Sequence, residues 1–277
     1  LGLWQEAIQS NLAAAAVAAK ATQAGQGDSS YQFHAMDFLD YSYLQSGQAA
    51  KARALVDELK SVPGATAKDI ANNQANLAAR NAIELHQWKE AAALPISDAN
   101  AGWEDTTYWA RAIGAARSGD VSGAQADSSK LVVLEIHQAT KAIPDALITV
   151  MKGVRDFEAD AWIDYAQGKD AEAVKAMHAA IAQEEARGMD SLAMPAHEML
   201  GDMLRDMKKP AEAMVEYRKA LVESPNRFDA LYGAAQAAQL SGKTAEARGY
   251  LARLVKICGP DADRPELAQA RIELAKK

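Results

Sequence analysis

Apolar residues recur along this chain at the spacing of amphipathic helices, and the helices they predict come in pairs. The clearest pairs cover residues 194–225 and 228–259, each with a short turn between its first and second helix. The second helix opens with Pro-Ala-Glu-Ala in one pair and with Thr-Ala-Glu-Ala in the other. The last alanines of these openings, Ala213 and Ala247, are 34 residues apart. One helix pair is therefore repeated at a fixed period.

A period of 34 residues with this helix–turn–helix order is typical of tetratricopeptide repeats. Residues 194–259 resemble that family, and residues 195–201 and 210–213 are similar to those of a group of uncharacterised bacterial repeat proteins. The resemblance implies an all-α fold, a right-handed α-solenoid of antiparallel helix pairs with a C-terminal capping helix. Members of the group are often longer and look exported, so the resemblance also favours a periplasmic location over a cytoplasmic one.

The same pattern continues along the chain and predicts a single tetratricopeptide-like solenoid domain over residues 1–277. Its spacing is irregular, because loops and unequal helices interrupt the array. The expected parts are an orphan second helix at 1–20, helix pairs at 33–63, 69–95, 105–140, 145–185, 194–225 and 228–259, and a cap at 261–277. The anchor alanines expected to open the second helices are Ala7, Ala52, Ala91, Ala124, Ala173, Ala213 and Ala247.

Two stretches admit more than one interpretation. The branched residues of 131–136 suit a strand, but no pairing partner lies nearby in the sequence, so a buried helix is predicted. In the helix expected to begin at Pro144, the simple repeat frame puts Asp160 and Asp164 at packing positions. A slip of one residue puts Ala161 and Tyr165 there instead, and we prefer the slipped frame.

The first predicted helix lacks the partner that would complete its pair. Ile8 and Leu12 would then leave their apolar faces in water, which a repeat array avoids by covering its ends. We therefore expect either that the natural chain begins earlier or that another surface covers this edge. The same edge is a candidate contact for a homo-oligomer.

Charge and composition narrow the range of partners. The net charge of −7 and the absence of a basic stripe argue against nucleic acid and against an anionic membrane surface. Cys258 is the only cysteine, so neither an intrachain disulfide nor a thiolate zinc site is possible. The longest apolar run near the start is too short to span a bilayer, so no membrane insertion is expected.

The resemblance also implies a binding face. In this family the first helices line a concave groove, and residues just after the packing stripe point into it. Tryptophan and tyrosine rings among these positions suit a binding hot spot, although Trp109 and Trp162 would serve equally well as packing between repeats. The groove candidates are His34, Asp37, Tyr41, Asn73, Asn76, Arg80, Trp109, Trp162, Arg205 and Tyr232.

Some family members hold a peptide's terminal carboxylate with lysine, asparagine and arginine side chains. Asn73, Asn76 and Arg80 resemble part of that clamp, but the preceding first helix has His34 and Asp37 where a lysine is needed. The leading prediction is therefore a non-catalytic scaffold that binds a protein or peptide segment in its groove. A spacer or a dimer interface is a further structural alternative.

An enzyme or a small-ligand protein is the alternative from another class. His34 and Asp37 lie one helical turn apart, as a general base and its orienting carboxylate would, and Arg80 could complete a site near them. No catalytic motif, phosphate loop or dinucleotide fingerprint supports this alternative. The histidines lack metal-ligand spacing, so neither a metal nor a cofactor is predicted.

Overall fold

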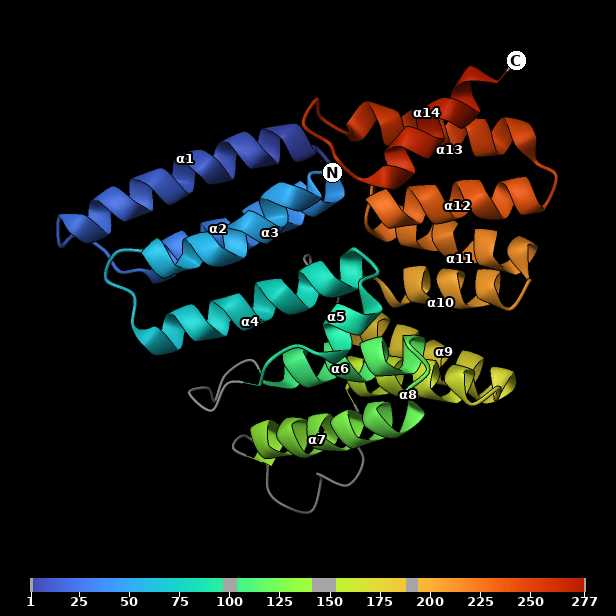
Figure 1. Cartoon of the computed structure of the whole chain (residues 1–277), viewed down its shortest axis with the longest axis horizontal. Helices are drawn as coiled ribbons and strands as arrows, with labels where there is room; N and C mark the ends of the chain where they lie inside the picture. Colours follow the sequence, from blue (N-terminus) through green and yellow to red (C-terminus); the bar gives the residue numbers. More distant parts are fainter. Residues whose placement is uncertain (1, 97–103, 141–152, 188–193, 277) are drawn as a thin grey trace. The chain divides into compact units, whose positions relative to one another are not determined.

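The computed structural model describes residues 2–96, 104–140, 153–187 and 194–276, and these residues form helices and turns without any strand (Figure 1). The all-α prediction is confirmed. The expected helix start at Pro144 lies outside the described residues. The run 131–136 belongs to helix α7 (Val121–Thr140), so the helical interpretation of that run is confirmed, but Val133 is 59% exposed and the run is not buried throughout.

The chain forms two compact units. Unit 1 consists of residues 1–77 and 191–277, and unit 2 consists of residues 78–190. Helix α4 (Ala67–Glu84) gives its first turns to unit 1 and its last turns to unit 2. The single solenoid domain over 1–277 stays a prediction.

Unit 1 contains helices from both ends of the sequence. In Figure 1, α10 to α13 follow one another side by side. The helices of unit 1 besides α4 are α1 (Trp4–Gln23), α2 (Ser30–Gln45), α3 (Ala49–Glu58), α10 (Ala196–Asp206), α11 (Pro210–Glu223), α12 (Phe228–Leu240), α13 (Thr244–Ile257) and α14 (Pro265–Ala275), with a short 3-10 helix at Leu59–Ser61. Unit 2 adds α5 (Trp88–Ala92), α6 (Glu104–Arg117), α7, α8 (Val154–Ala166) and α9 (Asp170–Arg187).

The anchor alanines mark the same place in every second helix. Each is the fourth residue of its helix, in α1, α3, α5, α7, α9, α11 and α13. Ala52, Ala91, Ala124, Ala173 and Ala213 are completely buried, and Ala247 nearly so. A methyl group at this place suits a close helix contact, as at Ala91, which lies against Gly114 of α6.

A bulky side chain at an anchor position is expected to destabilise the pair. Ala213→Leu should lower the free energy of unfolding by about 1–3 kcal/mol through overpacking. Ala211→Leu, on the exposed side of the same helix, should change it by less than about 0.5 kcal/mol. Urea denaturation of both variants checks the prediction, and equal effects at the two positions would show that Ala213 is not at a close helix crossing.

The turns between paired helices also share one geometry. In each described pair, the residue two positions before the second helix has a positive φ, and these residues are Gly47, His86, Gly119, Gly168, Lys208 and Gly242. Glycine adopts this left-handed conformation without a Cβ penalty, which explains its use at most of these positions. The turn is repeated even where His86 and Lys208 must adopt the same conformation.

Tyr217 of α11 occupies the space between two first helices. A Cβ atom on Gly201 of α10 would lie 2.8 Å from Cδ1 of the Tyr217 ring, and one on Gly233 of α12 would lie 2.4 Å from its Cζ. Both positions must therefore be glycine for the ring to fit. The buried ring thus joins α10, α11 and α12 in the core of unit 1.

The slipped frame in α8 is confirmed at Ala161, which is completely buried, while Asp160, Asp164 and Tyr165 are all half-buried. A carboxylate at the position of Ala161 would need a partner in the core, whereas alanine packs there without one. The one-residue shift thus keeps both aspartates at the edge of the core.

The start of α1 is covered by a turn from the other end of the sequence. Trp4 Nε1 donates a hydrogen bond to the carbonyl of Asn226 (2.7 Å), and Asn226 Nδ2 donates to the carbonyl of Gly2 (3.1 Å). Ile8 is buried, as the expectation of a covering surface requires, but Leu12 remains 47% exposed. The first turns of α1 are therefore covered within unit 1, and the next turn is not.

Candidate functional site

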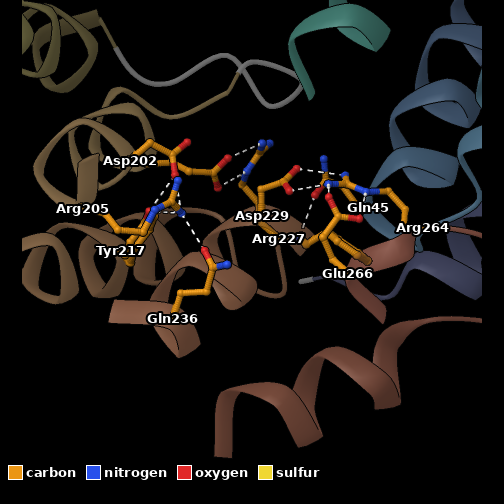
Figure 2. A network of polar contacts seen from close by, with 11 residues as sticks. Gln45, Asp202, Arg205, Tyr217, Arg227, Asp229, Gln236, Arg264 and Glu266 are labelled. Atoms are coloured by element: carbon orange, nitrogen blue, oxygen red, sulfur yellow. Dashed lines mark hydrogen bonds and ion pairs between the residues drawn. The ribbon is translucent and has the colours of Figure 1, made fainter. Parts of the chain in front are cut away.

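Two buried arginine–carboxylate pairs connect successive first helices of unit 1 (Figure 2). Arg227, the residue before α12, donates to both carboxylate oxygens of Glu198 on α10 at 2.8 and 2.9 Å. Arg264, the residue before α14, binds both oxygens of Asp229 on α12 at 3.1 and 2.7 Å. Such two-point contacts fix both the distance and the orientation of the partners. Arg227 therefore connects the start of α12 to α10, and Arg264 connects the start of α14 to α12.

The same two arginines also contact aromatic rings. Arg227 Nη1 donates to the hydroxyl of Tyr41 on α2 (3.0 Å), and the edge of Trp4 packs against the Tyr41 ring at 5.6 Å between centroids. The guanidinium of Arg264 lies 4.2 Å from the ring centre of Phe228, close enough for a cation–π interaction. Arg227 therefore joins α2 to the C-terminal repeats inside unit 1.

A third arginine, Arg205 at the end of α10, is only partly buried. Its Nη1 donates to the Tyr217 hydroxyl and to Gln236 Oε1, both at 3.0 Å, and lies 3.1 Å from Asp202 Oδ1. The Tyr217 hydroxyl in turn donates to Asp202 (2.6 Å). Burial and the Asp202 carboxylate raise the pKa of Tyr217 well above its ordinary value, so its hydroxyl stays protonated. Arg205 is thus held in one orientation by three neighbouring groups.

The contacts of Arg205 continue across two more helices. On α12 the Gln236 side chain lies beside the Tyr232 hydroxyl, and that hydroxyl donates to Gln269 Oε1 on α14 (3.1 Å). Burial and the Glu266 carboxylate raise the pKa of Tyr232, which favours the protonated, donating phenol. Arg205, Tyr232 and Gln236 are half-buried and Gln269 is exposed. We call these four residues the first-helix strip, because each lies on the first helix of a repeat or on the cap.

In unit 2 an arginine is stacked between two tryptophans. The Arg117 guanidinium at the end of α6 lies 4.8 Å from the ring centre of Trp88 on α5 and 4.2 Å from that of Trp162 on α8. His86 stacks on Trp88 at 5.0 Å, and Tyr165 meets Trp162 edge-on at 5.8 Å. These rings pack on one another and on Arg117, so they join α5, α6 and α8.

Trp109 of α6 is also a packed residue. It is 9% exposed, and its Nε1 donates to Oε2 of the buried Glu158 on α8 (2.7 Å). Arg155 lies over the same ring at 5.8 Å and binds Asp105 on α6 (2.7 Å). The indole is therefore the centre of a contact between α6 and α8.

Metal-ligating side chains do not cluster among the described residues of either unit. Within either unit, no three described His, Cys, Asp or Glu side chains bring their ligand atoms close together. Cys258 is half-buried, and burial raises the pKa of its thiol to about 12, which disfavours the reactive thiolate. No described helix combines the length and the apolar character that crossing a membrane requires.

The sequence matches no protein-family model and no curated protein sequence. Solved structures do match. A tetratricopeptide repeat protein from Parabacteroides merdae is similar over 98% of this chain and 97% of its own, with a TM-score of 0.51 and 15% sequence identity. The chain has the tetratricopeptide-repeat fold. Tetratricopeptide-like repeats of a Podosopora anserina kinesin light chain also match, at a TM-score of 0.38 and 16% identity over 82% of this chain and 94% of that one.

Within this tetratricopeptide-repeat fold, the predicted groove residues fall into different environments. Arg205 and Tyr232 lie together in the first-helix strip. Tyr41, Trp109 and Trp162 are buried in packing contacts, Tyr41 in unit 1 and both tryptophans in unit 2. That all of these residues form one groove stays a prediction.

The residues predicted for an enzyme site or a carboxylate clamp are engaged in separate local contacts. Asp37 accepts a hydrogen bond from Asn76 (3.1 Å), and His34, which is exposed, meets Phe38 edge-on. Asn73 donates to the carbonyl of Asp69 in its own helix (2.8 Å). Arg80 is half-buried on the part of α4 that belongs to unit 2. The two asparagines of the clamp-like pattern, Asn73 and Asn76, therefore bind groups of the protein itself, namely the carbonyl of Asp69 and the carboxylate of Asp37.

Sequence reasoning missed the buried arginines, although the repeats contain a signal for them. Arg227 and Arg264 each stand directly before a first helix, and each is followed two residues later by a carboxylate, in Arg-Phe-Asp229 and Arg-Pro-Glu266. An arginine and an acid that recur together at the same point of two tetratricopeptide repeats predict a ladder of ion pairs from repeat to repeat. Gln269 was missed because its helix was interpreted only as a cap.

Proposed function

We propose that this protein is a non-catalytic scaffold that binds a protein or peptide segment on the first-helix strip of unit 1. The observation that carries the proposal is the set of partly exposed side chains that neighbouring groups hold in place. Arg205 donates to Gln236 between α10 and α12, and Tyr232, which lies beside Gln236, donates to Gln269 between α12 and α14. A surface that is already ordered loses less conformational entropy when a ligand binds.

The composition of the strip suits a peptide better than a small charged ligand. Tyrosine and arginine are the residues most enriched at binding hot spots. Arg205 is a donor at every nitrogen, so Gln236 accepts from it through Oε1. Tyr232 then donates to Gln269 Oε1, which leaves the Gln269 amide nitrogen to donate to a ligand. We infer that the strip offers a hydrogen-bond donor to a peptide carbonyl beside the partly exposed Tyr232 ring.

Tyr232→Ala tests this function directly. With a peptide selected from a random library on the intact protein, the variant should weaken binding by about 2 kcal/mol, roughly 30-fold in Kd. Its free energy of unfolding should change by less than about 1 kcal/mol, as for other surface positions. Fluorescence anisotropy gives the affinity and urea denaturation gives the stability.

Tyr250→Ala is the matched control, because Tyr250 is a half-buried tyrosine on the second helix α13 of the same repeat. It should leave the affinity unchanged. Gln269→Ala should weaken peptide binding, as Tyr232→Ala does. If selected peptides bind both of these variants as tightly as the parent, the strip is not the binding surface.

A further inference from the structure

Helix α3 receives its N-terminal cap from the far end of the chain. Gln48, the residue before α3, makes no capping hydrogen bond with its side chain. The carboxylate of Asp263, in the connection between α13 and α14, accepts hydrogen bonds from the backbone N–H groups of Ala49 (2.7 Å) and Ala50 (2.9 Å) instead. A carboxylate at this place satisfies two free amides and interacts favourably with the helix dipole.

The reverse contact caps a helix of the C-terminal repeats. Gln45, the last residue of α2, accepts a hydrogen bond from the backbone N–H of Phe228, the first residue of α12 (2.9 Å). Between these two caps, the carbonyl of Gly47 accepts from the backbone N–H groups of Asp263 (2.9 Å) and Arg264 (3.3 Å). We call Gln45, Gly47, Phe228 and Asp263 the clasp.

The clasp is not a contact that stacking of sequence neighbours produces. Repeats in an array contact the repeats next to them in the chain, whereas Ala49 and Asp263 are 214 residues apart. Its hydrogen bonds join backbone and polar side-chain groups, and the Asp263 side chain is at the surface, whereas Gln45 and Phe228 are buried. After separation, the amides of Ala49 and Ala50 that Asp263 caps would bind water, as exposed helix N-termini do.

We propose that the clasp is an autoinhibitory contact, which holds α2 against α12 and thereby covers Tyr41 and Gln45. This inference rests on the proposed function, because it assigns to α2 a further part of the first-helix binding face. Tyr41 binds Arg227 in the closed state, so residues of the chain itself occupy the place of a ligand. Release of the clasp exposes the Tyr41 face to a peptide.

The single cysteine reports directly on the clasp. Gly47 lies over Cys258, and a Cβ atom on Gly47 would be 3.3 Å from the Cys258 sulfur. In the folded parent protein, the thiol should react slowly with a maleimide reagent. Asp263→Ala removes both capping hydrogen bonds at the N-terminus of α3. It should raise the labelling rate about tenfold or more, because local opening becomes more frequent. The helical circular dichroism signal should stay unchanged.

Asp261→Ala is the control variant. Asp261 belongs to the same connection and forms an exposed ion pair with Lys51, but it caps no helix. Its labelling rate should equal that of the parent. Hydrogen exchange should become faster at Ala49 and Ala50 only in the Asp263 variant. If Asp263→Ala unfolds the protein, Gln45→Ala takes its place, and parental labelling and exchange rates in the folded variant would overturn the clasp.

The masking of Tyr41 needs a separate measurement. Peptides selected on the Asp263→Ala variant should bind it about tenfold or more tightly than the parent, and Tyr41→Ala in that background should remove the difference. Equal binding to both proteins overturns autoinhibition even when labelling shows that the clasp opens. Labelling needs no ligand and Tyr232 lies outside the clasp, so failure of the clasp and failure of the first-helix strip are distinguishable.

Discussion

Arg227→Ala is expected to lower the free energy of unfolding of unit 1 by about 3–5 kcal/mol, the usual cost of removing one partner from a buried ion pair. Arg227 and Glu198 are both completely inaccessible, and the arginine also binds Tyr41. The variant leaves the Glu198 carboxylate in the core without its guanidinium partner. Urea denaturation measures the loss, and hydrogen exchange should assign it to α2, α10 and α12.

An exposed ion pair provides the control for this prediction. Arg218 and Glu246 are about half and one-third exposed, so Arg218→Ala should cost less than about 1 kcal/mol. The double variant Arg227→Met with Glu198→Leu should recover much of the stability, because apolar residues remove the buried charge together with its partner. A single Arg227 variant as stable as the Arg218 variant would contradict the importance of the buried pair.

Trp109→Ala is expected to destabilise unit 2 by about 3–5 kcal/mol, as large-to-small substitutions of buried tryptophans do. The indole fills the contact between α6 and α8, and its N–H is bound to Glu158. The variant therefore loses the volume of the ring and a buried hydrogen bond together. Denaturation followed by circular dichroism gives the size of the effect, and hydrogen exchange should place it in α6 and α8.

Trp109→Phe separates these two contributions, because it keeps most of the apolar volume and removes only the N–H donor. It should cost about 1–3 kcal/mol, the usual penalty for a lost partner of a buried charged group. Tryptophan at a ligand-contacting surface position would give the opposite result, with stability nearly unchanged and ligand binding lost. Such a result for Trp109→Ala would restore this residue as a groove anchor.

The repeat frame predicted that Arg205 and Tyr232 share one face of the first helices, and both lie in the first-helix strip, because that prediction needs only the offset from the packing stripe of the same helix. Tyr41 was predicted by the same rule, and it is buried on α2. Its partner Arg227 is 186 residues away in the sequence, so the local frame contained no information on whether Tyr41 is open or covered. The two tryptophans show the same limit, since exposure depends on the neighbouring helices.

The helices, their pairing, the shared turn and the anchor alanines were determined by the sequence alone, because each depends on residues within one repeat. Periodic apolar positions, a small residue at each close crossing and glycine at most turns are local requirements. Only the tertiary structure decided that Asp263 caps α3, that Arg227 also binds Tyr41, and that the N-terminal helices belong to the same unit as the C-terminal ones. These contacts depend on small rotations that accumulate from repeat to repeat, and no local pattern in the sequence specifies their sum.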